Sequence, residues 1–89
     1  MENPLPFEEE WISDKISIRR FASDTNSEEL KWHFDEEDRV IETEENTDWQ
    51  FQFDNKLPQP ILGKILIKKG EWHRLIRGSS ELSIKITRL

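Results

Sequence analysis

The chain contains 89 residues, which suffices for one domain with a small hydrophobic core, because a domain of this length buries only about 60 to 65% of the surface that its unfolded chain exposes. Nineteen acidic residues against thirteen basic ones give a formal net charge of −6, which argues against a nucleic-acid partner, since phosphate binding needs a clustered basic face. The absence of cysteine excludes disulfide bonds, a thiolate nucleophile and cysteine-based metal sites.

Hydropathy and length together set the expected location and assembly. No segment approaches the run of about 20 apolar residues that crosses a bilayer, and residues 1–15 lack a basic start followed by an apolar run. We therefore expect a cytoplasmic protein with no membrane partner. Because small domains often bury additional surface between identical copies, we also expect a homodimer.

Residues 1–12 are expected to form an N-terminal arm. Pro4 and Pro6 remove backbone donors there, and three consecutive glutamates follow. Such an arm is suited to pairing with a sheet edge or with a second subunit. The remainder, residues 13–89, is expected to fold as a single domain, because no linker, low-complexity segment or internal repeat interrupts it.

Most of the domain shows the two-residue hydrophobic period of β-strands. The period begins at Ile16 and Ile18, and it is clearest in a segment that places three aromatic side chains on one face, expected to be core, namely Trp49, Phe51 and Phe53. Further strands are expected over residues 30–35, over 39–45 and as three segments between 61 and 89, with turns at 69–70 and 78–80. Six to eight short strands with almost no helical period are typical of a β-sandwich or a small β-barrel.

The two histidines and the acidic residues after the first of them form the main candidate site. His33 and Asp35 share one face of an expected strand, and side chains two residues apart on a strand can reach the same ion. If a later strand brings His73 alongside, two imidazoles and a carboxylate form a ligand set for iron(II), manganese, nickel or zinc. The same residues can instead form a metal-free polar lining, in which a histidine donates a hydrogen bond to Asp35 or Asp38.

The stretch around the second histidine, "GKILIKKGEWHRLIRG" at residues 63–78, resembles the second conserved motif of the cupin superfamily. In that motif a glycine opens a strand, a proline-containing turn follows, and a histidine stands three residues after a second glycine. Gly63, Gly70 and His73 match these positions, whereas Lys68 stands in place of the proline.

The stretch "WHFDEEDRVIE" at residues 32–42 is similar to the first cupin motif. His33 fits the first histidine of that motif, Asp35 takes the place of the second, and the motif's downstream glutamate has no matching position. The resemblance covers roughly residues 27–87. It implies a double-stranded β-helix or jelly roll, often dimeric, in which side chains of both motifs hold a metal inside the barrel.

Asp38 and Arg39 are candidate ligand-binding residues. The forked guanidinium of Arg39 suits either the carboxylate of an acidic small molecule or an ion pair with Asp38. The leading hypothesis is thus a small cupin-like protein whose barrel binds a divalent metal and a small molecule in a reaction that the sequence does not define. The alternative, from another class, is a metal-free interaction module that acts through its acidic face or its arm.

The aromatic neighbours of the first histidine bear on the oligomeric state. Trp32 and Phe34 flank His33 on the opposite face of the expected strand, so they point outward if His33 points into the barrel. An uncovered aromatic pair is a liability for a protein in water. We therefore expect the arm or a second subunit to cover them.

Overall fold

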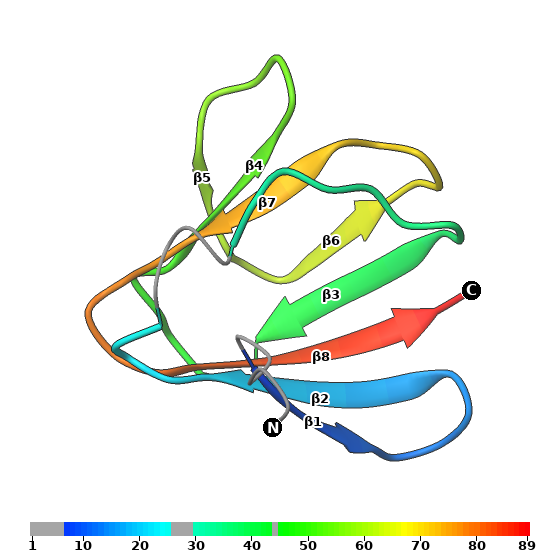
Figure 1. The fold of residues 1–89 in the computed structure, drawn as a ribbon, viewed down its shortest axis with the longest axis horizontal. Coiled ribbons are helices and arrows are strands. Elements are labelled where there is room, and N and C mark those ends of the chain that lie inside the picture. The colour runs from blue at the N-terminus through cyan, green and yellow to red at the C-terminus, as the bar shows by residue number, and fades with distance from the viewer. Residues whose placement is uncertain (1–6, 26–29, 44) are drawn as a thin grey trace, which may run out of the picture.

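A computed structural model describes residues 7–25, 30–43 and 45–89 of the chain (Figure 1). In these segments the regular secondary structure is entirely β-strand, which confirms the all-β prediction. None of the described residues belongs to a helix long and apolar enough to cross a membrane.

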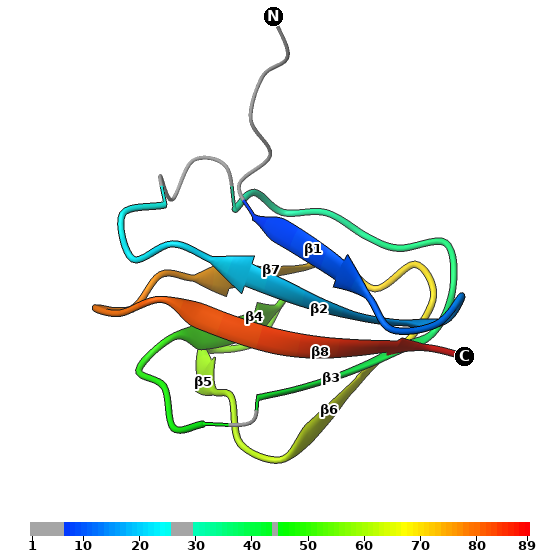
Figure 2. The same ribbon diagram turned by 90° about the horizontal axis from the view of Figure 1, so that it is seen from below.

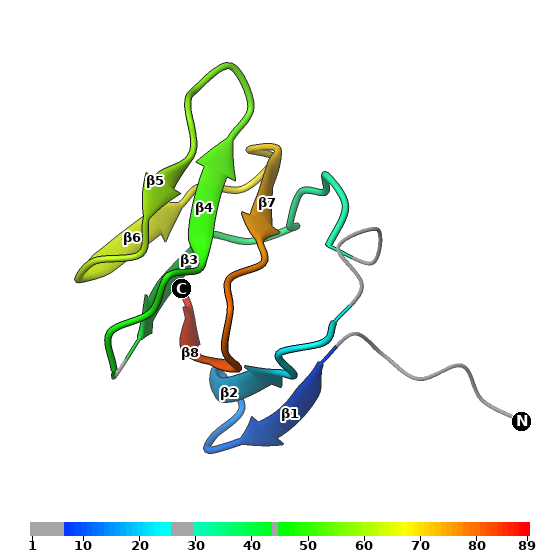
Figure 3. The ribbon, with the colours of Figure 1, turned by 90° about the vertical axis from the view of Figure 1, so that its left-hand side faces the viewer.

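Eight strands form two antiparallel sheets. They are β1 (Glu8–Trp11), β2 (Ile16–Phe21), β3 (Arg39–Thr43), β4 (Gln50–Phe53), β5 (Gln59–Pro60), β6 (Lys64–Ile67), β7 (His73–Ile76) and β8 (Leu82–Arg88). The larger sheet has the order β1-β2-β8-β3-β6 and the smaller one the order β5-β4-β7. Figure 2 shows β2 and β8 in front of β4 and β7, and Figure 3 shows β4 and β7 on one side of the barrel with β2 and β8 on the other.

The hydrophobic core fills the space between the two sheets. Trp49 and Phe51 are almost completely buried, as predicted, and Phe53 is partly buried against them. The larger sheet contributes residues from four of its strands, namely Phe21 of β2, Ile41 of β3, Ile65 and Ile67 of β6, and Leu82, Ile84 and Ile86 of β8. The alternation read from the sequence therefore places Trp49 and Phe51 correctly in this core.

Two glycines make the turns that shape β6 and β7. Gly63 has a φ of 60° just before β6, and Gly70 has a φ of 82° in the turn between β6 and β7. Both values lie in the left-handed region, which glycine adopts without the steric penalty of a side chain. The turn at Gly70 is the one that leads into His73.

The segment before β3 differs from the expected strand. Residues 30–35 form a single bridge to β7 at His33 and are otherwise irregular, so the prediction of a continuous strand there is wrong. Backbone hydrogen bonds hold this segment at two residues. His33 exchanges two hydrogen bonds with His73 of β7, and the carbonyl of Asp35 accepts one from the N–H of Gly70 in the preceding turn. The alternation of residues within the segment could not reveal this irregular conformation, because the conformation depends on which backbone groups of a distant turn are free to form hydrogen bonds.

The inner face of β2 carries polar residues as well as apolar ones. Ser17 and Arg19 lie opposite Ile86 and Ile84 of β8 in the sheet register, on the same face as buried Phe21. The alternation of Ile16 and Ile18 thus predicts the strand correctly, but those two side chains occupy the outer face.

A charged cluster at β1 explains how polar residues are accommodated inside. One carboxylate oxygen of Glu9 accepts hydrogen bonds from Ser17 Oγ at 2.7 Å, from Arg19 Nε at 2.7 Å and from Arg88 Nη2 at 3.2 Å. Glu9 thereby ties β1 to β2 and β8. Residues 8–11 of the expected N-terminal arm form β1 on the edge of the larger sheet of the same chain, and residues 1–6 of that arm lie outside the described residues.

We predict that Glu9→Gln lowers the free energy of unfolding by about 2 kcal/mol at pH 7, because hydrogen bonds to a largely buried charged group are lost. Burial raises the pKa of Glu9, but the hydrogen bonds from Arg19 and Ser17 and the charges of Arg19 and Arg88 outweigh it and hold that pKa below its ordinary 4.5. The stabilisation is therefore complete above pH 4.5 and is lost as the pH falls through the lower folded-state pKa. Denaturant unfolding of both proteins across this range measures the difference.

Glu10→Gln is the matched control. Glu10 pairs with Arg20 at 2.8 Å, but the Glu10 side chain is 55% exposed, so its loss is expected to cost less than about 0.5 kcal/mol. Equal effects of the two substitutions, or a Glu9 effect that does not diminish at low pH, would contradict the assigned role of the cluster.

Candidate functional site

The two histidines are neighbours in space although forty residues separate them in the sequence. His73 is the first residue of β7 and is 4% exposed. The backbone N–H of His33 donates to the carbonyl of His73 at 3.1 Å, and the N–H of His73 donates to the carbonyl of His33 at 2.9 Å. This reciprocal pair brings the imidazole rings to a centroid distance of 4.4 Å.

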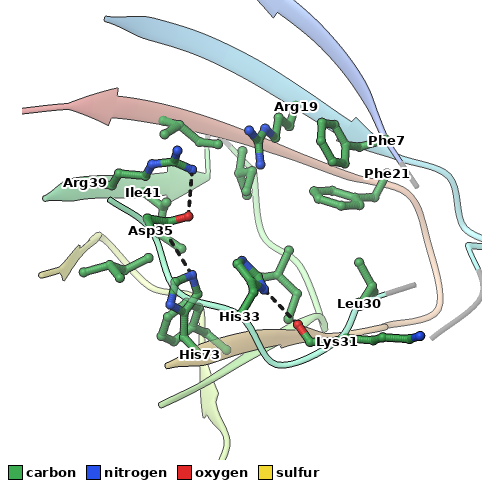
Figure 4. A pocket seen from close by; sticks show the side chains of 15 residues that line it. Phe7, Arg19, Phe21, Leu30, Lys31, His33, Asp35, Arg39, Ile41 and His73 are labelled. Carbon is green, nitrogen blue, oxygen red and sulfur yellow. Dashed lines mark hydrogen bonds and ion pairs between the residues drawn. The ribbon is translucent and has the colours of Figure 1, made fainter. Parts of the chain in front are cut away.

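Asp35 is positioned between the histidines and Arg39. Its backbone carbonyl accepts a hydrogen bond from the N–H of Gly70 at 3.0 Å, and its side chain is 9% exposed. One carboxylate oxygen lies 3.3 Å from His73 Nε2, and the other lies 3.2 Å from Arg39 Nη1 (Figure 4). His33, Asp35 and His73 each offer one ligand atom, and these atoms lie within 4.8 Å of one another.

Backbone carbonyls orient both imidazole rings. The Nδ1 atom of His33 lies 2.8 Å from the carbonyl oxygen of Lys31, and Nδ1 of His73 lies 2.8 Å from that of Glu71. A carbonyl oxygen can only accept, so Nδ1 carries the proton in each ring. In the neutral imidazole, Nε2 then has a free lone pair, the form in which histidine binds a metal.

The contact between His73 and Asp35 is therefore incomplete as it stands. With its Nδ1 proton already donated to Glu71, a neutral His73 directs the Nε2 lone pair at a carboxylate oxygen, which is also an acceptor. Two acceptors at 3.3 Å repel each other unless a positive charge lies between them. Either a proton on Nε2 or a metal cation supplies that charge.

The electrostatic surroundings keep Asp35 ionised. Burial raises the pKa of Asp35, but the hydrogen bond that a protonated His73 donates and the positive charge of Arg39 outweigh it, with smaller contributions from the charges of protonated His73 and His33, so that its pKa lies below the usual range. The carboxylate is thus in the deprotonated form that binds cations.

The donor set fits a divalent metal ion. Imidazole nitrogens and a carboxylate oxygen bind a divalent ion such as zinc at about 2.0 to 2.2 Å, which leaves two ligand atoms on one ion roughly 3 to 4 Å apart. The 3.3 Å between His73 Nε2 and the Asp35 oxygen is already in that range. Two histidines and one carboxylate also leave coordination positions open for a substrate.

A cavity of about 300 Å³ adjoins these residues inside the barrel (Figure 4). Its charged and polar lining consists of Arg19, Lys31, His33, Asp35, Arg39 and His73. Its apolar lining consists of Phe7, Phe21, Leu30, Ile41, Phe51, Ile67, Leu75, Ile84 and Ile86. A chamber of this size, mostly apolar with a few convergent polar groups, has the character of a small-molecule site.

The structure separates the two predicted ligand-binding residues. Arg39 lines the cavity, whereas Asp38 is exposed and its carboxylate accepts a hydrogen bond from the backbone N–H of Lys69 at 2.8 Å. Asp38 stabilises the turn before β7 and does not line the cavity. Adjacency in the sequence suggested that Asp38 and Arg39 share a site, but their side chains point in different directions at the start of β3.

Sequence reasoning missed Arg19 as a cavity residue. The available signal was its position two residues before Phe21, which places both side chains on one face of β2. The more hydrophobic face, with Ile16 and Ile18, suggested the opposite orientation.

The aromatic neighbours of the histidines lie outside the cavity. Phe34 packs against Trp72 at a ring-centroid distance of 5.0 Å, and the guanidinium of Arg74 lies 4.7 Å from the ring centroid of Trp32. Trp32, Phe34 and Trp72 nevertheless remain 39%, 45% and 46% exposed. Neighbouring side chains thus cover these rings only in part.

We predict that His73→Ala lowers the free energy of unfolding of the metal-free protein by about 2 to 4 kcal/mol, because it leaves a cavity beside Phe51 and deprives buried Asp35 of a partner. His33→Ala removes an exposed ring and is expected to cost less than about 1 kcal/mol. Chemical unfolding in the presence of a chelator measures both. A larger loss for His33→Ala than for His73→Ala would contradict the assigned burial.

Comparison with known proteins identifies the fold through structure alone. No protein-family model matches the sequence, and the search of curated proteins gives no significant match. Among solved structures, a cupin domain from Bordetella pertussis is 13% identical, covers 100% of this chain and 98% of its own, and superposes with a TM-score of 0.63. A cupin-2 domain containing protein from Shewanella frigidimarina is 17% identical, with coverages of 97% and 81% and a TM-score of 0.61.

A third solved structure, FeII HppE, is 10% identical and has a TM-score of 0.61. The match covers 83% of this chain and 41% of the HppE chain, so the present chain corresponds to less than half of that protein. At these identities the likenesses show the fold, and they confirm the predicted jelly roll.

Proposed function

We propose that this chain, which has the cupin fold, holds one divalent metal ion through His33, Asp35 and His73 and binds a small molecule in the adjoining cavity. The three residues are those expected from the sequence, and they lie at the wall of the 300 Å³ chamber. Arg39 has the role of holding the Asp35 carboxylate in place and of lining the ligand chamber.

The observation that carries the proposal is the facing of His73 Nε2 and the Asp35 carboxylate. Both histidines have their Nδ1 atoms bonded to backbone carbonyls, so their remaining lone pairs are directed away from the backbone and are held in fixed orientations. Such carbonyl partners typically accompany metal-binding histidines, because they fix the tautomer and the ring orientation. A cation between Nε2 and the carboxylate turns a repulsive contact into an attractive one.

The donor set favours iron(II), manganese, nickel or zinc, in that these ions accept mixed imidazole and carboxylate ligands. The shared fold with FeII HppE supports iron(II) as the first ion to test. When bound, a metal of this kind supplies Lewis-acid polarisation or oxygen activation at its open positions. The apolar walls of the chamber exclude water from the ligand, and Arg39 holds the Asp35 carboxylate in place.

We predict that iron(II), manganese, nickel or zinc, supplied in excess over the protein, raises the thermal midpoint of the metal-depleted protein. A ligand at 100 times its dissociation constant stabilises the folded state by about 2.7 kcal/mol, which for a domain of this size corresponds to roughly 10 °C or more. His33→Ala should abolish the shift, because it removes one of three ligands while leaving the His73 and Asp35 pair intact. Differential scanning calorimetry and metal analysis provide the measurements.

Asp38→Asn is the control, since Asp38 lies close in sequence but outside the chamber, and it should retain the full metal-dependent shift. Retention of the shift in His33→Ala would remove His33 from the site. If none of the four ions stabilises the wild type, the metal site is refuted. The alternative of a metal-free interaction module then applies, with a proton on His73 Nε2 completing the contact to Asp35.

The homodimer and the cytoplasmic location stay predictions. Support for the dimer comes from the partly exposed aromatic residues beside the site, Trp32, Phe34 and Trp72. We predict that the wild type has the mass of a dimer in solution and that Trp32→Glu shifts it to a monomer. Light scattering coupled to size exclusion measures the mass, and Leu57→Glu, at a loop residue that is 85% exposed, should remain dimeric. A monomeric wild type would refute the dimer.

A further inference from the structure

We propose that the ligand of the chamber is a small organic acid, whose carboxylate binds between Arg19 and Arg39 and whose apolar body packs against the aromatic residues beyond them. The inference rests on the small-molecule part of the proposed function and names the class of ligand. It does not require the metal ion.

The first observation is an excess of positive charge inside an acidic protein. Three arginine side chains are largely buried at one end of the barrel, with exposed fractions of 20% for Arg19, 16% for Arg39 and 11% for Arg88. The buried acids that pair with them are Glu9 and Asp35, whereas the third acid, Glu37, is 35% exposed. Three buried cations thus face two buried anions, and only a partly exposed carboxylate balances the third charge, so a further buried counter-charge is favourable.

The pKa of Arg88 is affected by the neighbouring positive charges. Burial lowers the pKa of Arg88, the charges of Arg39 and Arg19 lower it further, and Glu9 offsets them only in part. The remaining partner of Arg39 is Glu37, which lies 3.4 Å away at the protein surface. A bound monoanion would restore neutrality to the interior.

The second observation is that both cavity-lining guanidinium groups retain unused donors. Arg19 uses Nε to bond Glu9, and the described part of the chain offers its two Nη atoms no hydrogen-bond acceptor. Arg39 engages Asp35 through Nη1 and Glu37 through Nη2, and its buried Nε, which has no partner in the same part of the chain, becomes available to a ligand only if the guanidinium turns toward the chamber. Figure 4 shows these two side chains approaching the chamber from β2 and β3. Planar guanidinium forks match the two oxygens of a carboxylate.

The third observation is the apolar lining on the far side of Arg19. Phe7 and Phe21 lie there with ring centroids 5.5 Å apart, and Leu30 completes this wall (Figure 4). One water molecule takes up about 30 Å³ in the liquid. A chamber of about 300 Å³ therefore accommodates a ligand of roughly ten non-hydrogen atoms. An acid of the size of benzoate therefore fits, whereas inorganic phosphate would leave the aromatic wall without contacts.

The experiment compares benzoate with benzamide, its neutral counterpart of the same shape, and with inorganic phosphate. Thermal shift and calorimetric titration are performed in the presence of a chelator, so that no metal contributes. We expect benzoate to stabilise the wild type at millimolar concentration and benzamide to bind at least ten-fold more weakly, because it lacks the charge. Phosphate should give no shift.

Arg19→Gln and Arg20→Gln form the matched pair of variants. Both residues lie on β2, but the Arg20 side chain is 46% exposed and pairs with Glu10 on the outer face. Arg19→Gln should weaken benzoate binding about ten- to hundred-fold, the effect of losing a charge-assisted hydrogen bond. Arg20→Gln should bind benzoate as the wild type does.

Equal binding of benzoate and benzamide, or equal effects of the two variants, would overturn the inference. Benzoate binding that appears only with metal and survives Arg19→Gln would overturn it as well, while leaving the metal site in place. Conversely, binding that occurs in chelator and depends on Arg19 supports the inference even if the metal site fails. If Arg19→Gln does not fold, the Nε–H resonance of Arg19 in the wild type must shift on benzoate addition while that of Arg20 does not, and any other result contradicts the proposal.

Discussion

The reciprocal backbone hydrogen bonds between His33 and His73 are the constraint on which the site depends. They join an irregular segment to the first residue of β7, at 3.1 and 2.9 Å, and a third bond from Gly70 to the carbonyl of Asp35 continues the attachment. Because the backbone is held, the side chains of His33, Asp35 and His73 converge without a continuous strand. Each imidazole is then oriented by a carbonyl two residues before it, at Lys31 or Glu71.

The interior of the barrel is divided between an apolar end and a charged end. The charged end requires inward-facing polar residues on strands, which an isolated small domain cannot accommodate without partners. Glu9 supplies one partner by bonding Ser17, Arg19 and Arg88 at once, and Asp35 supplies another to Arg39. The edge strand β1 thus contributes to the interior as well as to the sheet, since its residue Glu9 provides the carboxylate that pairs with Arg19 and Arg88.

Much of the fold follows from local sequence, whereas the site follows only in part. Alternation predicts β2, β3, β4, β6, β7 and β8 but not the two-residue strand β5, and the two glycines with positive φ mark the turns around β6. The convergence of His33 with His73 could be anticipated from the cupin resemblance. The placement of Asp38 outside could not, because it depends on a contact with the N–H of Lys69, 31 residues away. The placement of Arg19 inside was indicated only by its position two residues from Phe21, and the more hydrophobic face with Ile16 and Ile18 concealed it.

The unequal attachment of the three candidate ligands has a kinetic consequence. His73 belongs to a strand that pairs with β4 along four residues, whereas His33 and Asp35 lie on a segment that three backbone hydrogen bonds hold to β7 and its turn. Breaking those three bonds would carry two of the side chains away from the third without unfolding either sheet. Local openings of this kind occur at lower free energy than global unfolding. The rate at which an occupant enters or leaves would then be set by the opening of residues 30–35, and the stability of the barrel would not limit it.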